Sequence, residues 1–297
     1  MIFMTKNEFR LISDGILREI LRKKQILEKD PNYYLHYSNG KKKSLRNEAN
    51  KHSISLELVG YNTQTSRDKK VKSREQKISE KNLRNAIDWG LNNYTGELSY
   101  DFVLNLGHLI EPRLNSKDSF RADKVRISGA TWSPPGPEKL DREAKVFLYE
   151  NSCLDNIIEK AVHAHFNIAR IHPFYDGNGR TARAVQNLIL EHSSFLPANV
   201  HLSERLEYNH LLDSAINSYK IAEGDLSIED LQRSQELYGL INKSDISEKE
   251  KEHCKNLSLS LAKEKMRVEQ GDFYNFMALK MRDTLEKEVG YLYERRT

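Results

Sequence analysis

Apolar side chains recur at helical spacing along most of this 297-residue sequence. In the first such stretch they fall at Phe9, Ile12, Ile16 and Ile20, on one face of a helix whose opposite face is charged. The same spacing predicts further helices at residues 80–93, 99–111, 140–151, 154–170, 181–193 and 204–220, and a helical tail from about residue 225 with a second run at 269–293. The pattern therefore predicts an all-α fold.

One segment departs from helical spacing. Residues 120–139 hold a short alternating run, then a glycine and the proline-rich sequence WSPPGP. Alternation that ends in glycine and proline is typical of a β-hairpin or an extended flap. We therefore expect one small β-hairpin in an otherwise helical chain.

Composition limits the classes of protein that the chain can belong to. Lys and Arg number 47 and Asp and Glu 43, and the net charge of +4 is too small to predict nucleic acid as a partner. The only cysteines, Cys153 and Cys254, form no CxxC motif, which is typical of a protein from a reducing compartment. No window is apolar over the length that a membrane span needs. We expect a soluble cytoplasmic protein without a membrane partner.

The sequence IHPFYDGNGRTAR, residues 171–183, joins two predicted core helices. Its glycines, Gly177 and Gly179, come at the start of the second helix, where backbone N–H groups and the helix dipole favour an anion. Arg180 and Arg183 follow, three residues apart on the first turn, and their guanidinium groups suit phosphate oxygens. This stretch predicts a polyphosphate site.

Two further residues of the stretch indicate what such a site would do. Asp176 would repel a bare phosphate, but a carboxylate suits Mg²⁺, which binds through one or two carboxylates together with phosphate oxygens. His172 can accept a proton near neutral pH. A metal ligand and a base beside a phosphate site predict transfer from a nucleotide to a hydroxyl group.

The stretch HPFYDGNGRTAR resembles the signature of the Fic (filamentation induced by cAMP) family, HPFx[DE]GNGRxxR, at every fixed position. The preceding AHFNIARIHPF and the following ERLEYNHLL (204–212) are also similar to the family, so the resemblance covers roughly residues 100–220. It implies a helical Fic core whose hairpin flap, here about residues 125–134, aligns a target protein. It also implies AMP transfer from ATP, with Mg²⁺, to a Ser, Thr or Tyr hydroxyl.

The resemblance assigns a role to each residue of the motif. It implies that His172 is the general base and that Asp176 is the Mg²⁺ ligand. It further implies that Asn178 holds the α-phosphate, together with the backbone of Gly177 and Gly179.

Arg180 and Arg183 would engage the outer phosphates, and many family members block that contact with an inhibitory helix of pattern [ST]xxxE[GN]. Two stretches of this chain qualify, and neither has the usual Gly or Asn after its Glu. The sequence SISLEL offers Ser53 and Glu57, with an apolar residue before the Glu as is usual in the family. The sequence SLRNEA offers Glu48 as a second choice. We favour Glu57 and keep open that neither is inhibitory.

The expected organisation has an N-terminal helical region with the inhibitory helix (1–95), a Fic core (96–222) and a C-terminal helical region (223–297). The expected function is a protein adenylyltransferase, autoinhibited in cis, whose partners are ATP and a target protein that could be the chain itself. Removal of AMP from a modified protein, with the inhibitory Glu positioning a water, uses the same residues and stays open. A regulatory nucleotide-sensing or binding module is the alternative outside catalysis, and the C-terminal region could also form a homodimer.

Overall fold

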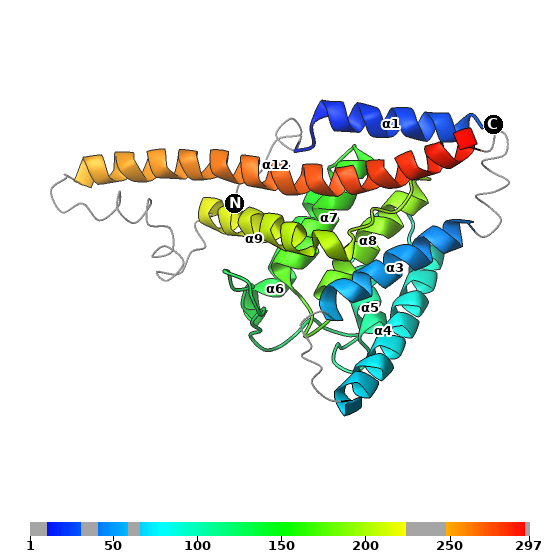
Figure 1. Cartoon of the computed structure of the whole chain (residues 1–297). Helices are drawn as coiled ribbons and strands as arrows, with labels where there is room; N and C mark the ends of the chain where they lie inside the picture. The colour runs from blue at the N-terminus through cyan, green and yellow to red at the C-terminus, as the bar shows by residue number, and fades with distance from the viewer. Residues whose placement is uncertain (1–10, 31–40, 59–65, 224–247, 295–297) are drawn as a thin grey trace.

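The structure is a computed structural model that describes residues 11–30, 41–58, 66–223 and 248–294 (Figure 1). In these residues the chain is all-α, as predicted. The helices are α1 (Asp14–Glu28), α3 (Lys42–Leu58), α4 (Ser66–Asn93), α5 (Tyr100–Ile110), α6 (Pro137–Ser152), α7 (Ile157–Ile171), α8 (Asn178–His192), the short 3-10 helix η2 (Leu202–Glu204), α9 (Arg205–Glu223) and α12 (Glu248–Glu294).

Helices α7 and α8 form the centre of the molecule (Figure 1). Almost every residue of both helices is buried, including several polar ones. Alanines in both helices allow close packing, and Ala161, Ala164 and Ala182 have no exposed surface. The connection between these two helices is therefore held between two of the most buried helices of the fold.

The C-terminal helix α12 is one continuous helix of 47 residues (Figure 1). The sequence predicted a helical run at 269–293, which lies within it; the predicted start near residue 225 lies outside the described residues. Helix α12 packs between α9 and α1, so the first and the last described helices lie side by side. Among the described residues, no helix is long and apolar enough to cross a membrane.

The predicted β-hairpin is wrong: residues 120–136, here called the flap loop, contain no strand. The guanidinium of Arg121 donates to the carbonyls of Asp123 and Pro135, which closes the base of the flap loop. At its tip, the N–H of Thr131 donates to the Asp213 carboxylate of α9 at 3.1 Å. Side chains therefore satisfy backbone groups that a hairpin would pair across two strands.

Candidate functional site

The motif loop, residues 172–177, leads from the C-terminus of α7 to the N-terminus of α8. His172 adopts the left-handed conformation, with φ 51°, and ends α7; Gly177, with φ 78°, precedes the first residue of α8. The first N–H groups of α8 have no partner within the helix and face the end of the loop. The local geometry thus brings both motif glycines and the first N–H groups of α8 together at the end of the motif loop.

The motif loop is fixed from inside by Asn178 and Phe174. The Asn178 side chain accepts from the N–H of Phe174 and donates to its carbonyl, both at 2.9 Å. The Phe174 ring is buried against Gly107 of α5, where an added Cβ would lie 2.1 Å from the ring. Because the side-chain amide of Asn178 bonds to Phe174 within the loop, the group that Asn178 can present to a phosphate is its backbone N–H.

The imidazole ring of His172 is neutral near pH 7. Burial lowers the pKa of His172 to about 4, although a hydrogen bond to the carbonyl of Ala169 opposes the shift. That carbonyl can only accept, so Nδ1, 3.4 Å away, carries the proton. Nε2 then has a free lone pair for a proton from a substrate.

Asp176 has an exposed carboxylate that bonds to neighbouring groups of the motif. One carboxylate oxygen accepts from the N–H of Gly177 at 2.7 Å, and the other lies 3.1 Å from Nη2 of Arg180. The side chain is 51% exposed, so its remaining lone pairs are accessible. No cluster of three or more metal-ligating side chains occurs among the described residues. A single carboxylate fits Mg²⁺, which keeps several waters and takes its other ligands from substrate phosphates.

The two motif arginines are joined to helix α3 by one glutamate. Nε of Arg180 donates to Glu57 at 2.6 Å, and Nη2 of Arg183 donates to the other Glu57 oxygen at 2.9 Å. Arg183 also donates to the side chain and the carbonyl of Ser53, at 2.8 and 3.0 Å. An added Cβ at Gly179 would lie 2.9 Å from Glu57, so the glycine is what admits this carboxylate.

The second-choice glutamate lies elsewhere. Glu48 is on the same helix but faces Lys287 of α12 at 3.4 Å. The structure thus brings Ser53 and Glu57 to the arginines and leaves Glu48 outside the site.

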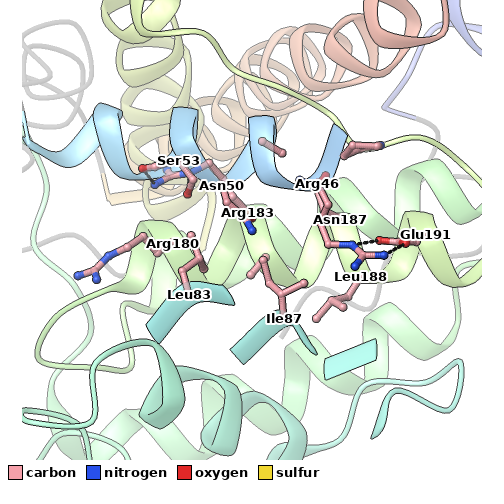
Figure 2. A pocket seen from close by; sticks show the side chains of 13 residues that line it. Arg46, Asn50, Ser53, Leu83, Ile87, Arg180, Arg183, Asn187, Leu188 and Glu191 are labelled. Carbon is pink, nitrogen blue, oxygen red and sulfur yellow. Dashed lines mark hydrogen bonds and ion pairs between the residues drawn. The ribbon is translucent and has the colours of Figure 1, made fainter. Parts of the chain in front are cut away.

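Helix α3 lies across α8, with Ser53 above Arg183 (Figure 2). An ion pair between Arg46 and Glu191 joins the same two helices further along, and Nε of Arg46 donates to Glu191 at 3.0 Å. Between the two sets of contacts lies a cavity of about 20 Å³, which is room for one water molecule. The α3–α8 interface is therefore held at two separate points.

Glu111 is a site residue that sequence reasoning missed. It is 5% exposed at the end of α5, and Oε2 lies 3.6 Å from Nη1 of Arg180. Burial by itself lowers the pKa of Arg180, but the carboxylates of Glu57, Asp176 and Glu111 outweigh burial and raise it. These four charged residues line part of a pocket of about 570 Å³ beside the motif. The sequence around Glu111 matches no motif that could have indicated it.

Asn115 and Arg121 were missed as well. Asn115 donates from one amide to the carbonyls of both Gly107 and Asp176, at 2.9 Å each. Nε of Arg121 donates to the carbonyl of His172 at 2.8 Å. Both side chains hold the motif loop by its backbone, and no sequence pattern predicts such contacts.

Comparisons with known proteins agree with this geometry. Residues 97–190 match the sequence model of the Fic/DOC family. Over 118 residues the chain is 35% identical to protein adenylyltransferase Fic of Nematostella vectensis, which covers 38% of this chain and 26% of that protein. Over 116 residues it is 32% identical to protein adenylyltransferase fic-1 of Caenorhabditis elegans, covering 38% and 23%. The matched segment spans about a quarter of the length of these relatives.

Solved structures show a similar fold at low sequence identity. A fragment of Fic-1 from C. elegans superposes with a TM-score of 0.56 at 18% identity, covering 95% of this chain and 73% of that fragment. A Fic domain containing signaling protein from Bacteroides thetaiotaomicron gives a TM-score of 0.53 at 17% identity, covering 86% and 96%. Residues 97–190 of this chain therefore match a Fic/DOC family domain, and the chain is distantly similar to the protein adenylyltransferases called Fic.

Proposed function

We propose that this chain is a protein adenylyltransferase that transfers AMP from ATP to a hydroxyl group of a protein, and that Glu57 inhibits this transfer. The observation that carries the proposal is the motif site itself. It holds a neutral histidine with a free Nε2 beside a helix N-terminus and two buried arginines.

In this proposal His172 starts the reaction. Its Nε2 takes the proton of the target hydroxyl, and the hydroxyl oxygen attacks the α-phosphorus of ATP. The bond from the α-phosphorus to the bridging oxygen breaks, and pyrophosphate leaves with the electron pair. A histidine that is neutral at pH 7 suits this task, because a protonated one could not accept the proton.

The phosphates would be bound by groups that the fold already aligns. The backbone N–H groups at the start of α8 would hold the α-phosphate, and Arg180 and Arg183 would hold the outer two. Asp176 would bind the Mg²⁺ that accompanies ATP, and when bound this ion neutralises charge on the phosphate oxygens.

The restraint by Glu57 follows from competition for the same donors. Arg180 and Arg183 each donate to a Glu57 oxygen, so the outer phosphates would have to displace that carboxylate. A phosphate near Glu57 would also meet a like charge. ATP would then bind without placing its α-phosphorus in line with the target oxygen. Residues 42–58 would act as the inhibitory helix of the N-terminal region.

The test uses α-phosphate-labelled ATP with Mg²⁺ and follows label retained on protein, both on the chain itself and in a cell extract. Glu57→Gly should increase the label by about tenfold or more, because both arginines become available. His172→Ala in the Glu57→Gly background should abolish it. Glu48→Gly is the matched control, because it makes the same substitution on the same helix away from the arginines, and it should leave the label unchanged.

The proposal fails if no variant retains label although ATP binds. If these variants instead release AMP from a labelled protein, and Glu57→Gly stops that release, the reaction is AMP removal. The two Glu57 oxygens bound to arginines would then serve to orient a water.

A further inference from the structure

His172 has a backbone conformation that its residue type disfavours. Its φ of 51° and ψ of 56° lie in the left-handed region, and among the described residues the only other non-glycine with a positive φ is Ser194. For a residue with a Cβ this conformation is sterically unfavourable. It persists only where the surrounding structure holds the backbone in place, so His172 needs such a support.

The conformation determines where the imidazole ring of His172 lies. The left-handed turn brings the ring beside the last turn of α7, where Nδ1 lies 3.4 Å from the carbonyl of Ala169. The N–H of His172 donates to the carbonyl of Ile168 at 3.0 Å and so ends the helix. The turn, the protonation of Nδ1 and the direction of Nε2 therefore depend on one another.

The support for this turn comes from Arg121. Its Nε donates to the carbonyl of His172 at 2.8 Å, and its backbone N–H donates to the next carbonyl, that of Pro173, at 3.0 Å. Bonds to two consecutive carbonyls fix the direction of the peptide that follows His172. Arg121 is 3% exposed, so little water competes for these carbonyls, and the bonds are strong for that reason.

The buried guanidinium of Arg121 is held by three backbone carbonyls. Besides the bond from Nε to His172, Nη1 donates to the carbonyl of Asp123 at 2.7 Å and Nη2 to that of Pro135 at 2.6 Å. Burial lowers the pKa of Arg121, but a guanidinium stays charged in proteins. A lysine offers its donors from one atom and could not span carbonyls that Nε, Nη1 and Nη2 reach separately. The contact set therefore requires arginine.

The charge of Arg121 also favours the neutral ring of His172. Burial is the main reason that the pKa of His172 falls to about 4, and the positive charge of Arg121 acts in the same direction. The hydrogen bond to Ala169 and the carboxylate of Asp176 act in the opposite direction. A nearby cation thus opposes protonation of the ring that has to accept a proton.

We infer that Arg121 is a positioning residue: by holding the carbonyl of His172, it keeps the imidazole in the orientation from which Nε2 can take the proton of a target hydroxyl. The inference rests on the proposed function and adds to it a residue outside the motif. The same guanidinium also holds Asp123 and Pro135, near the two ends of the flap loop. The direction of Nε2 is therefore fixed relative to that loop.

The test separates the positioning of His172 from nucleotide binding. Arg121→Lys and Arg121→Gln are made in the Glu57→Gly background, and circular dichroism at the assay temperature checks that they are folded. The rate of label transfer at saturating Mg²⁺·ATP and the Kd for ATP, from calorimetry, are then measured. Both variants should lower the rate about 30- to 100-fold, because a base displaced by about 1 Å loses its alignment, and change the Kd by less than about twofold.

Arg205→Lys in the same background is the matched control. Nε of Arg205 also donates to a backbone carbonyl at 2.8 Å, that of Leu56 on α3. With Glu57 already replaced, a looser α3 has no inhibitory carboxylate to withdraw, so this variant should change neither the rate nor the Kd by more than about twofold. The inference is overturned if Arg121→Lys keeps the full rate, or if it weakens ATP binding as strongly as it slows transfer.

Nitrogen NMR of the histidines in the full chain gives a readout that needs no activity. Near pH 7 the His172 signals, identified by their loss in His172→Ala, should show one tautomer with the proton on Nδ1, and Arg121→Lys should show a mixture of both tautomers. If the Glu57→Gly chain with Arg121 intact retains no label, the proposed function is wrong and the NMR result decides alone. A mixture then supports the positioning role, and an unchanged single tautomer overturns it.

Discussion

The motif loop (172–177) and the flap loop (120–136) touch each other, yet their conformations have different origins. The motif loop is fixed largely by residues next to it in sequence. The Asn178 side chain bonds to both the N–H and the carbonyl of Phe174, and the Thr181 hydroxyl donates to the carbonyl of Gly177 at 2.8 Å. The flap loop is fixed at its tip by α9, where Asp213 accepts from Thr131 across 82 positions of sequence. A local pattern can therefore predict the first loop and not the second.

Beside the Tyr175 hydroxyl, which accepts from the N–H of Ala122 at 3.0 Å and donates to Asp123 at 2.8 Å, the contact between the two loops is made by Arg121. Its N–H donates to the carbonyl of Pro173 at 3.0 Å, and its guanidinium donates to three carbonyls on both loops. Arg121 is thus a shared anchor of both loops, and substitutions can test each loop and this anchor separately.

Arg121→Ala should have the largest effect on stability, because it removes the shared anchor. The change leaves the carbonyls of His172, Asp123 and Pro135 without their donor, and we expect a loss of about 3 kcal/mol in the free energy of unfolding. Urea denaturation measures it. Arg126→Ala, at an exposed position of the same flap loop, should change little. Equal losses for the two variants would contradict the assigned anchor.

Gly107→Ala should disturb the motif loop alone. The new methyl group would lie 2.1 Å from the Phe174 ring, which is 1% exposed and has no space to move. Overpacking of this kind costs about 2 kcal/mol, which urea denaturation would detect, together with weaker ATP binding. Gly15→Ala is the control, since an added Cβ there meets nothing within 4 Å, and it should be neutral or stabilising.

Lowering the pH should weaken the core behind the motif loop. Burial holds the pKa of His165 at about 3, below the value of about 6.5 expected in the unfolded chain, so the unfolded chain binds more protons below pH 6.5. The stabilisation is present above pH 6.5 and is lost as the pH falls toward the folded pKa. Between pH 7 and 5 it should decrease by about 2 kcal/mol.

Urea denaturation at several pH values checks this expectation, and His165→Asn should flatten the dependence because the buried proton acceptor is gone. His172, whose pKa burial lowers to about 4, acts in the same direction. A midpoint that is the same at pH 5 and pH 7 would contradict the buried neutral state of both rings.

Asp213→Ala should have the smallest effect on stability and act on the flap loop alone. It removes the acceptor of two Thr131 donors at a partly exposed site, for a loss of about 1 kcal/mol. Trypsin cleavage after Lys124 and Arg126, both exposed in the flap loop, should become faster. Glu207→Ala, an exposed acid on the same helix, is the control. Unchanged cleavage for Asp213→Ala would show that α9 does not hold the loop.

The fold class and the position of the motif loop between two core helices could be predicted because they depend on short-range patterns. Helical spacing gave α7 and α8, and the spacing of His172, Asp176 and Arg183 placed the site on the loop between them. Glu57 was favoured over Glu48 from its local sequence, and the structure places Glu57 beside the arginines. Continuity of α12 through residues 248–294 was only partly foreseen, since charge at many positions weakens the periodic signal.

The sequence by itself determined an all-α chain and one loop that combines a histidine, a carboxylate and a glycine-flanked helix start, because these follow from spacings of a few residues. Tertiary structure alone decided which distant side chains complete that loop: Glu111, Asn115 and Arg121 come from helices and loops whose sequences carry no signature. It also decided the charge state of His172, because desolvation depends on what packs around the ring. Burial and long-range hydrogen bonds are properties of the packed molecule, and no local pattern encodes them.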